Sequence, residues 1–192
     1  MKRKLYYYIC IVLALMLGVA TLAGCKDGGG DGGNGSAESA LSGPTADILQ
    51  HILDEATAAL GDEVPATFVD PVTAEIAPSE LGVLQDDFVS YVDEATAAKA
   101  AIATFAFQVA VIKCSSEDDA KTINEQIMKE YDSTKWVCVF PEQSVTIVSG
   151  SYILLAVGYE AQVTELTDAF KELAGGAYSA PNIFYEGETG PE

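Results

Sequence analysis

The first 44 residues differ in composition from the rest of the chain, and they limit the part that can fold into a globular core. A basic head, Met1 to Lys4, precedes an uncharged run from Leu5 to Gly24 that is rich in Ile, Val, Leu and Ala. Cys25 follows, and the stretch up to Pro44 is dominated by Gly, Ser, Asp and Asn without apolar periodicity. Such a composition is typical of a flexible spacer. We therefore expect one domain of ordinary size over 45–175.

The residues just before Cys25 resemble the lipobox of bacterial lipoproteins, because Leu22, Ala23 and Gly24 place small residues ahead of a cysteine at the end of an apolar run. The resemblance implies that residues 1–24 are a signal peptide and that Cys25 becomes the first residue of the mature chain. Its thiol would carry fatty acyl chains such as palmitate, and more than one chain gives stable anchoring.

An uncleaved transmembrane helix is the alternative, since the 20 uncharged residues from Leu5 to Gly24 are just long enough to span a bilayer. In both cases the rest of the chain faces outward. We expect a lipid-anchored protein on the extracytoplasmic face of the cell membrane, with 25–44 as a spacer.

Acidic residues dominate the chain that remains after residues 1–24 are removed. It holds 7 lysines, no arginine and 29 acidic residues, a formal charge of −22. Nucleic acid is excluded as a partner, because the cations that displace counterions from phosphates are missing. Cations and basic partners are the favourable ligands. The plainer interpretation, which we favour, is that the charge keeps the domain soluble at a crowded surface.

Apolar periodicity predicts alternating helices and strands. Helices are expected from Thr45 as N-cap to Leu60, from Ser116 as N-cap to about Asp132, and over 162–173. Strands are expected over 104–113, 144–148 and 152–158, and the last is apolar on both faces, as in a central strand.

The remaining segments give weaker patterns. Residues 62–82 carry three prolines and look irregular, 87–92 is a short extended or turn-like segment, and 95–103 is ambiguous. The tail, 176–192, is acidic and without a clear element. Short connections favour antiparallel pairing. We expect the α+β class, as a two-layer sandwich with a mainly antiparallel sheet and helices packed on one face.

Two stretches resemble an uncharacterised family of small gram-positive bacterial lipoproteins, known as a domain of unknown function. One is VAVIKC, ending at Cys114 and followed by SSEDDAKTI. The other is the hairpin VSGSYILLAV, from Val148 to Val157, which is one residue shorter at the turn than the family pattern. The resemblance covers roughly 47–173. It implies a lipobox, a Gly-rich spacer and a single α+β domain, and it brings no catalytic residues.

Two cysteines remain for the folded domain, since Cys10 leaves with the leader and Cys25 takes lipid. Cys114 and Cys138 can form a disulfide in an oxidising compartment, closing a loop that holds a helix. The alternative is two buried free thiols, and the sequence does not decide between them. The pair has no CxxC spacing and no nearby histidine, so we expect no zinc site.

Catalytic patterns are missing from the sequence. The one histidine, His51, has Asp47, Asp54 and Glu55 within helical reach; these four could form a weak metal patch, but a solvated face fits better. There is no GxSxG elbow, no phosphate-binding Gly-rich loop with lysine and no DxDxDG calcium loop. Adjacent acids such as Asp86 and Asp87 point away from each other. We predict no enzyme activity, no catalytic residue, no metal and no cofactor.

Our leading hypothesis is a non-catalytic binding or interaction module at the cell envelope, with an envelope protein as partner. The alternative is a cation or small-ligand binding lipoprotein that uses acidic side chains around 62–94. A third is a hydrolase with a carboxylate site built from distant acids. Several surface residues are candidates for contacts, although ordinary packing fits each of them better. They are Tyr91, Asp93, Glu94, Trp136, Tyr159 and Tyr185.

Overall fold

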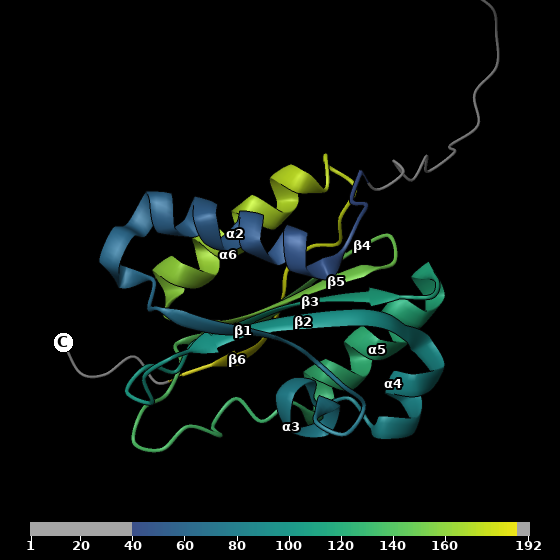
Figure 1. The fold of residues 1–192 in the computed structure, drawn as a ribbon, viewed down its shortest axis with the longest axis horizontal. Helices are drawn as coiled ribbons and strands as arrows, with labels where there is room; N and C mark the ends of the chain where they lie inside the picture. Colours follow the sequence, from purple (N-terminus) through teal and green to yellow (C-terminus); the bar gives the residue numbers. More distant parts are fainter. Residues whose placement is uncertain (1–39, 188–192) are drawn as a thin grey trace, which may run out of the picture. The chain divides into compact units, whose positions relative to one another are not determined.

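A six-stranded antiparallel sheet carries helices on both of its faces (Figure 1). The structure is a computed structural model that describes residues 40–187. The predicted α+β class and antiparallel sheet are confirmed. The expectation of two layers, with helices on one face, is wrong: α2 and α6 cover one face, and α3, α4 and α5 cover the other.

The elements are as follows, in chain order. The helices are α2 Thr45–Leu60, α3 Ala77–Leu81, α4 Gln85–Tyr91, α5 Glu117–Glu130 and α6 Glu160–Leu173, with a 3-10 turn at Gly61–Glu63. The strands are β1 Thr67–Pro71, β2 Val92–Ala100, β3 Gln108–Cys114, β4 Gln143–Ser149, β5 Tyr152–Gly158 and β6 Asn182–Glu186. Their order across the sheet is β1-β2-β3-β5-β4-β6.

The two central strands explain why both faces are covered. β5 is buried at every position, and β3 is buried at every position except Lys113. Alternate side chains of a strand point to opposite faces. Val109 and Val111 therefore join a core with α2 and α6, whereas Ala110 and Ile112 join a core with α3, α4 and α5. A sheet with apolar residues on both faces needs a helical layer on each to remove them from water.

Local sequence signals set the ends of the long helices. Ser116 is the N-cap of α5, as predicted, and its Oγ accepts a hydrogen bond of 3.1 Å from the Asp119 amide. Thr45, in contrast, is not the N-cap of α2: Pro44 precedes the helix without a side-chain cap. The Thr45 hydroxyl is buried instead, 2.8 Å from the hydroxyl of Thr96 on β2. This pair fixes the start of α2 on the sheet.

Several segments without a clear local pattern are ordered by pairing with distant parts of the chain. The region predicted to be irregular, 62–82, contains β1 and α3, and the expected extended segment at 87–92 is helix α4. The ambiguous stretch at 95–103 contributes most of β2. The tail was expected to be irregular, yet β6 pairs antiparallel with β4. Long-range backbone hydrogen bonds, which short sequence windows do not reveal, stabilise all of these strands.

The predicted signal peptide 1–24, the lipidation residue Cys25 and the spacer up to residue 39 lie outside the described residues, as does 188–192. Among the helices of residues 40–187, none is long and apolar enough to cross a bilayer.

Candidate functional site

A groove of about 440 Å³ opens where β4, β5 and β6 meet at one end of the sheet. Three of its six lining residues are aromatic, and one is a glutamate. We call it the aromatic groove. It is lined by Phe140, Pro141, Glu142, Tyr159, Tyr185 and Gly187.

Backbone pairing brings three separate segments together around the aromatic groove. Gln143 pairs with Gly158 on one side and with Glu186 on the other. The ladder continues past the strand ends, because the Glu142 amide donates to the Gly158 carbonyl at 2.9 Å and the Gly187 amide donates to the Glu142 carbonyl at 2.8 Å. A Cβ on Gly187 would lie 2.5 Å from the Pro141 carbonyl oxygen. The close approach of these two backbones therefore requires glycine at this position.

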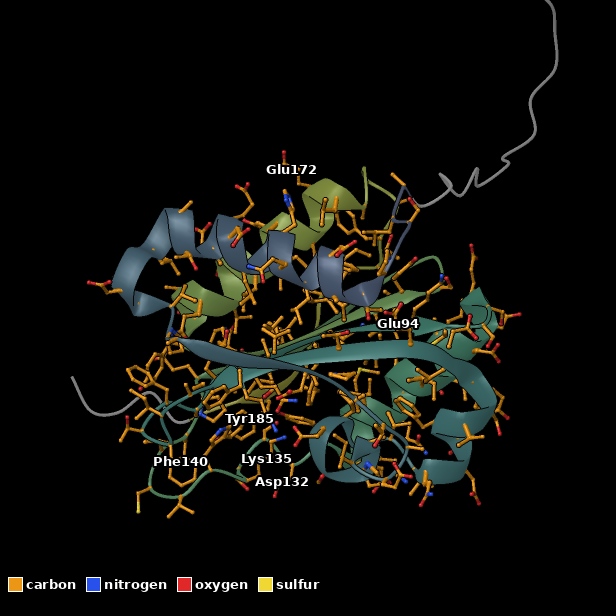
Figure 2. The ribbon with its side chains drawn as sticks, viewed as in Figure 1. Glu94, Asp132, Lys135, Phe140, Glu172 and Tyr185 are labelled. Atoms are coloured by element: carbon orange, nitrogen blue, oxygen red, sulfur yellow. The ribbon has the colours of Figure 1, made fainter. Side chains whose placement is uncertain are left out.

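The aromatic rings of the groove are accessible to solvent. Phe140 is 59% exposed and Tyr159 is 41% exposed, while Tyr185 is half-buried. Figure 2 shows Phe140 and Tyr185 at the same end of the domain. Tyr159 is held in place as the residue before α6, where its amide donates to Gln162 Oε1 at 2.9 Å. Exposed rings around a concavity are a typical arrangement for binding, since rings supply large contact areas at low entropic cost.

One carboxylate lines the groove, and two further exposed acids are sequence neighbours of its tyrosines. Glu142 is the lining residue, Glu160 follows Tyr159, and Glu186 follows Tyr185 in the chain. Glu142 Oε2 accepts a hydrogen bond of 2.8 Å from the Glu160 amide, at the positive end of the α6 dipole. None of the three acids takes part in an ion pair with a lysine among residues 40–187. The charged group in the lining of the groove is therefore the Glu142 carboxylate.

A cluster around Lys135 anchors the start of the loop, 131–142, that leads to the groove. We call it the lysine cluster; its members are Lys135, Tyr131, Trp136, Glu80 and Lys99. The Lys135 ammonium donates to the Ser79 carbonyl at 3.0 Å, at the C-terminal end of α3. It also lies 4.6 Å from the ring centre of Tyr131 and 5.4 Å from that of Trp136. Burial lowers the pKa of Lys135 to about 8, and the nearby Glu80 carboxylate opposes this shift. The contacts are those of a lysine that caps a helix C-terminus.

Glu80 and Tyr131 extend the lysine cluster into the sheet. Glu80 Oε1 accepts from the Lys99 ammonium at 2.7 Å, and its buried Oε2 has no hydrogen-bond partner within 40–187. The Tyr131 hydroxyl donates to Gln108 Oε1 at 3.1 Å, and Gln108 Nε2 donates to the Glu80 carbonyl at 2.8 Å. Burial raises the pKa of Tyr131 well above its ordinary value, and Glu80 adds to the effect. These bonds connect α3, β3 and the loop, which is a structural task.

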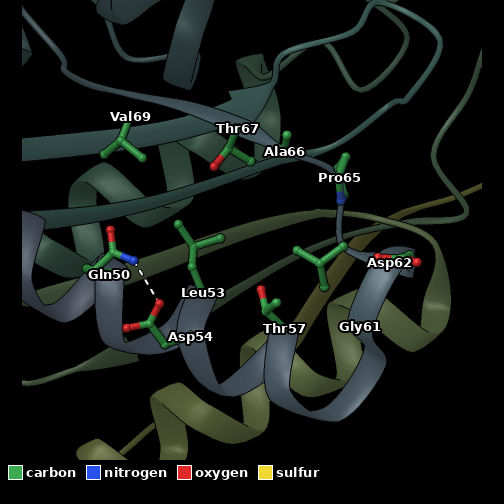
Figure 3. Close-up of a pocket in the computed structure, with 11 residues that line it drawn as sticks. Gln50, Leu53, Asp54, Thr57, Gly61, Asp62, Pro65, Ala66, Thr67 and Val69 are labelled. Carbon is green, nitrogen blue, oxygen red and sulfur yellow. Dashed lines mark hydrogen bonds between the residues drawn. The ribbon is translucent and has the colours of Figure 1, made fainter.

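A second groove, of about 540 Å³, lies between α2 and the edge strand β1 (Figure 3). We call it the α2–β1 groove. Its lining mixes apolar residues such as Leu53 and Val69 with the acids Asp54 and Asp62. Gln50 Nε2 donates to Asp54 Oδ1 at 2.8 Å across its rim. No aromatic ring lines it, so it offers less contact energy than the aromatic groove.

The structure brings together some of the surface residues singled out from the sequence. Tyr159 and Tyr185 line the aromatic groove, and Trp136 belongs to the lysine cluster. The other three, Tyr91, Asp93 and Glu94, lie at the opposite end of the sheet, where α4 ends and β2 begins. There Asp93 Oδ1 accepts from the Ser115 hydroxyl at 2.6 Å, and Glu94 Oε2 accepts from the Thr45 amide at 3.2 Å. Their interactions stabilise the fold.

Sequence reasoning missed Phe140 and Glu142 as members of a site. The available signal was the short apolar run ending at Phe140, directly before Pro141 and an acid. That run forms no strand in the structure and leaves Phe140 exposed.

Both cysteines of the described domain are free thiols. Cys114 is 1% exposed at the end of β3, whereas Cys138 is exposed in the loop between α5 and β4, with φ of +64°. The structure therefore does not contain the disulfide. The other alternative, two buried free thiols, describes Cys114 but not Cys138, which is exposed. Burial raises the pKa of Cys114 to about 12, and the carboxylates of Asp119 and Asp93 add to the shift.

His51 is exposed on α2, as expected for a solvated face. Across residues 40–187, no group of three or more His, Cys, Asp or Glu side chains is placed to hold a metal ion.

Comparison of this chain with protein-family models, with curated proteins and with solved structures found no match.

Proposed function

We propose that this protein is a lipid-anchored, non-catalytic interaction module of the cell envelope, and that it binds a protein partner at the aromatic groove. The anchor is the one predicted at Cys25. The observation that carries the proposal is the groove itself: Phe140, Tyr159 and Tyr185 surround a concavity of about 440 Å³ and leave their rings accessible.

The position of the groove relative to residues 40–43 supports this proposal. Residues 40–43 join the domain where β5 begins: the Tyr152 hydroxyl donates to the Gly43 carbonyl at 3.0 Å, and the Ala40 amide donates to the Ala174 carbonyl at 3.5 Å. The aromatic groove lies at the other end of β5, after Gly158. Six residue steps of a strand separate the two ends by roughly 20 Å. A lipid on Cys25 would hold the domain from the first end and leave the groove free.

Site-specific photocrosslinking in cells tests the proposal. A photoreactive phenylalanine analogue would replace Phe140 in the full-length chain, and the matched control would carry it at Phe68 on β1, which is 63% exposed against 59% for Phe140. A discrete adduct to one envelope protein from position 140, without the same adduct from position 68, is the expected result. Equal adducts from both positions, or none from position 140, would contradict it.

The role of the anchor is tested in the same cells. With Cys25→Ala, the position-140 adduct should be lost or strongly reduced, because the chain is no longer held at the membrane surface. An undiminished adduct would show that the partner does not depend on anchoring.

Small-ligand binding is the second candidate function, and the α2–β1 groove is the observation that favours it. Asp54 and Asp62 place two carboxylates in its lining. Asp62 belongs to the acidic region 62–94, for which the sequence predicts such a role, and Asp54 precedes that region. A panel of solutes and divalent cations, added to the full-length protein, would raise its melting temperature if one of them binds the folded state. A panel that leaves the melting temperature unchanged would remove this candidate.

A further inference from the structure

We propose that the aromatic groove binds a lysine side chain on a basic segment of the partner protein, with the ammonium group over the rings and beside the Glu142 carboxylate. This inference rests on the proposed function, since it names the chemistry that the partner must present. It follows from three observations: the rings, the carboxylates, and the way in which the domain uses its own lysines.

The rings of the groove are of the kind that binds ammonium groups, and the domain itself provides the comparison. Lys135 lies over the rings of Tyr131 and Trp136, and Lys113 lies 5.8 Å from the ring centre of Tyr152. These are the cation–π contacts found within residues 40–187, and none of them involves a ring of the groove. The faces of Phe140, Tyr159 and Tyr185 are thus free of an internal cation. A cation within about 6 Å of such a ring is attracted by the ring quadrupole.

The Glu142 carboxylate adds charge to this preference. Glu142 lines the groove, and Glu160 and Glu186 adjoin its two tyrosines in the chain. Carboxylates without a cationic neighbour raise the local concentration of positive groups. Glu142, Glu160 and Glu186 do not form a cluster placed to hold a metal, so an organic cation is the fitting class of ligand.

The lysines of the domain are already engaged, which leaves its negative charge unbalanced. Residues 40–187 contain six lysines and 24 acidic residues. Lys99, Lys121, Lys129 and Lys171 form ion pairs with single carboxylates, and the other two lysines lie over aromatic rings. Only four of the 24 carboxylates are used in this way. An external basic polypeptide therefore complements the domain, and the aromatic groove supplies the specific contact.

The test measures binding of a fluorescently labelled peptide of alternating lysine and glycine to the full-length protein in detergent at low ionic strength. A peptide of equal length with glutamine in place of lysine is the ligand control. We expect Phe140→Leu and Tyr159→Leu to weaken binding of the lysine peptide about tenfold, because leucine retains apolar bulk but has no quadrupole. Glu142→Gln should weaken it about fivefold, and its amide oxygen can still accept from the Glu160 amide.

Each variant has a matched control. Phe68→Leu replaces a ring of similar exposure on β1, and Tyr178→Leu replaces one that is 41% exposed, as is Tyr159. Glu125→Gln removes an exposed acid from α5. These controls should change the affinity less than twofold. The circular dichroism spectra and melting curves of all variants are compared with those of the wild type. The groove variant and matched control whose spectra and curves stay closest to the wild type decide the outcome.

Three results would overturn the inference. Equal losses in the groove variants and their controls would mean that charge alone attracts the peptide. Unchanged affinity in both Phe140→Leu and Tyr159→Leu would exclude the rings. Tetramethylammonium that binds as tightly as the peptide would point to a small quaternary ligand instead of a protein segment. If the lysine peptide fails while the position-140 adduct persists in cells, the groove has a partner of different chemistry; if both fail, the proposed function fails as well.

Discussion

The backbone nitrogen of Tyr131 lies 2.5 Å from the point where a Cβ on Gly82 would stand. Gly82 follows α3 and has φ of +71°, in the left-handed region. Tyr131 follows α5 and begins the loop that leads to the aromatic groove. The two helix ends therefore touch backbone to backbone, and the contact depends on a residue without a side chain.

Gly82→Ala should destabilise the protein by about 2–4 kcal/mol, because it combines left-handed strain of about 1 kcal/mol with a clash that no side-chain rotation relieves. Gly176→Ala is the comparison for strain without a clash: Gly176 has φ of +93°, and nothing lies within 4 Å of the point where its Cβ would stand. It should lose only about 1–2 kcal/mol. Urea unfolding at neutral pH measures both, and equal losses would mean that the backbone contact adds nothing.

Thr146→Val should leave stability unchanged or raise it by about 1 kcal/mol. Thr146 is fully buried on β4, and its hydroxyl has no hydrogen-bond partner among the described residues. Valine has the same shape and removes a polar atom whose burial is not compensated.

Thr96→Val is the matched comparison, because Thr96 is only 5% exposed and its hydroxyl lies 2.8 Å from that of Thr45. This substitution should destabilise the protein by about 1–2 kcal/mol, since the Thr45 hydroxyl is left without its partner. Thermal unfolding of the two variants gives the comparison. A loss of stability in Thr146→Val that equals the loss in Thr96→Val would show that the Thr146 hydroxyl is hydrogen-bonded after all, for example to water.

Cys138 should react with iodoacetamide in the native protein much faster than Cys114. Cys138 is exposed, whereas Cys114 is buried and its pKa is raised to about 12, so its thiolate is scarce at pH 8. Peptide mapping by mass spectrometry after timed labelling distinguishes the two sites, and labelling in urea shows that Cys114 reacts once it is exposed. Labelling of neither residue without a reductant would indicate the disulfide that the structure does not contain.

The contrast between α5 and β6 shows which elements can be predicted from the sequence. Ser116 and Asp119 are three residues apart, so their capping interaction is a local signal, and the start of α5 could be predicted from it. The same is true of the β4–β5 hairpin, whose turn at Gly150 connects two apolar runs. β6 has no such signal, since its order comes from pairing with a strand more than thirty residues away.

The candidate site was less predictable for the same reason. Tyr159 and Tyr185 could each be named as exposed aromatics, but their proximity depends on the pairing of β4 with both β5 and β6. Phe140 enters the site only because the loop that starts at Tyr131 returns to the same end of the sheet. The sequence therefore predicts which side chains are available for binding, but it does not predict that they lie close together.

Lys135 should make the stability of the protein rise with pH in the range from about 8 to 10. Its pKa in the folded protein is about 8, against an ordinary value of 10.5. Between these values the unfolded chain holds a proton that the folded protein has released, so the free energy of unfolding increases with pH. Relative to Lys135→Met, which lacks this group, the wild type should gain on the order of 1–2 kcal/mol between pH 7 and 9.5.

The comparison with Lys135→Met cancels the titration of other groups, including Cys114. Lys121→Met is the control, because the pKa of Lys121 is shifted in the opposite direction. The adjacent Asp118 carboxylate raises this pKa, so the contribution of Lys121 to stability is retained throughout the range from pH 8 to 10 and is lost only at higher pH. Urea unfolding at half-unit pH steps gives the three curves. Parallel curves for the wild type and Lys135→Met would mean that Lys135 keeps its ordinary pKa and that the lysine cluster is open to water. A steeper rise in the wild type would locate the titrating group beside the rings of Tyr131 and Trp136, at the base of the loop that carries Phe140.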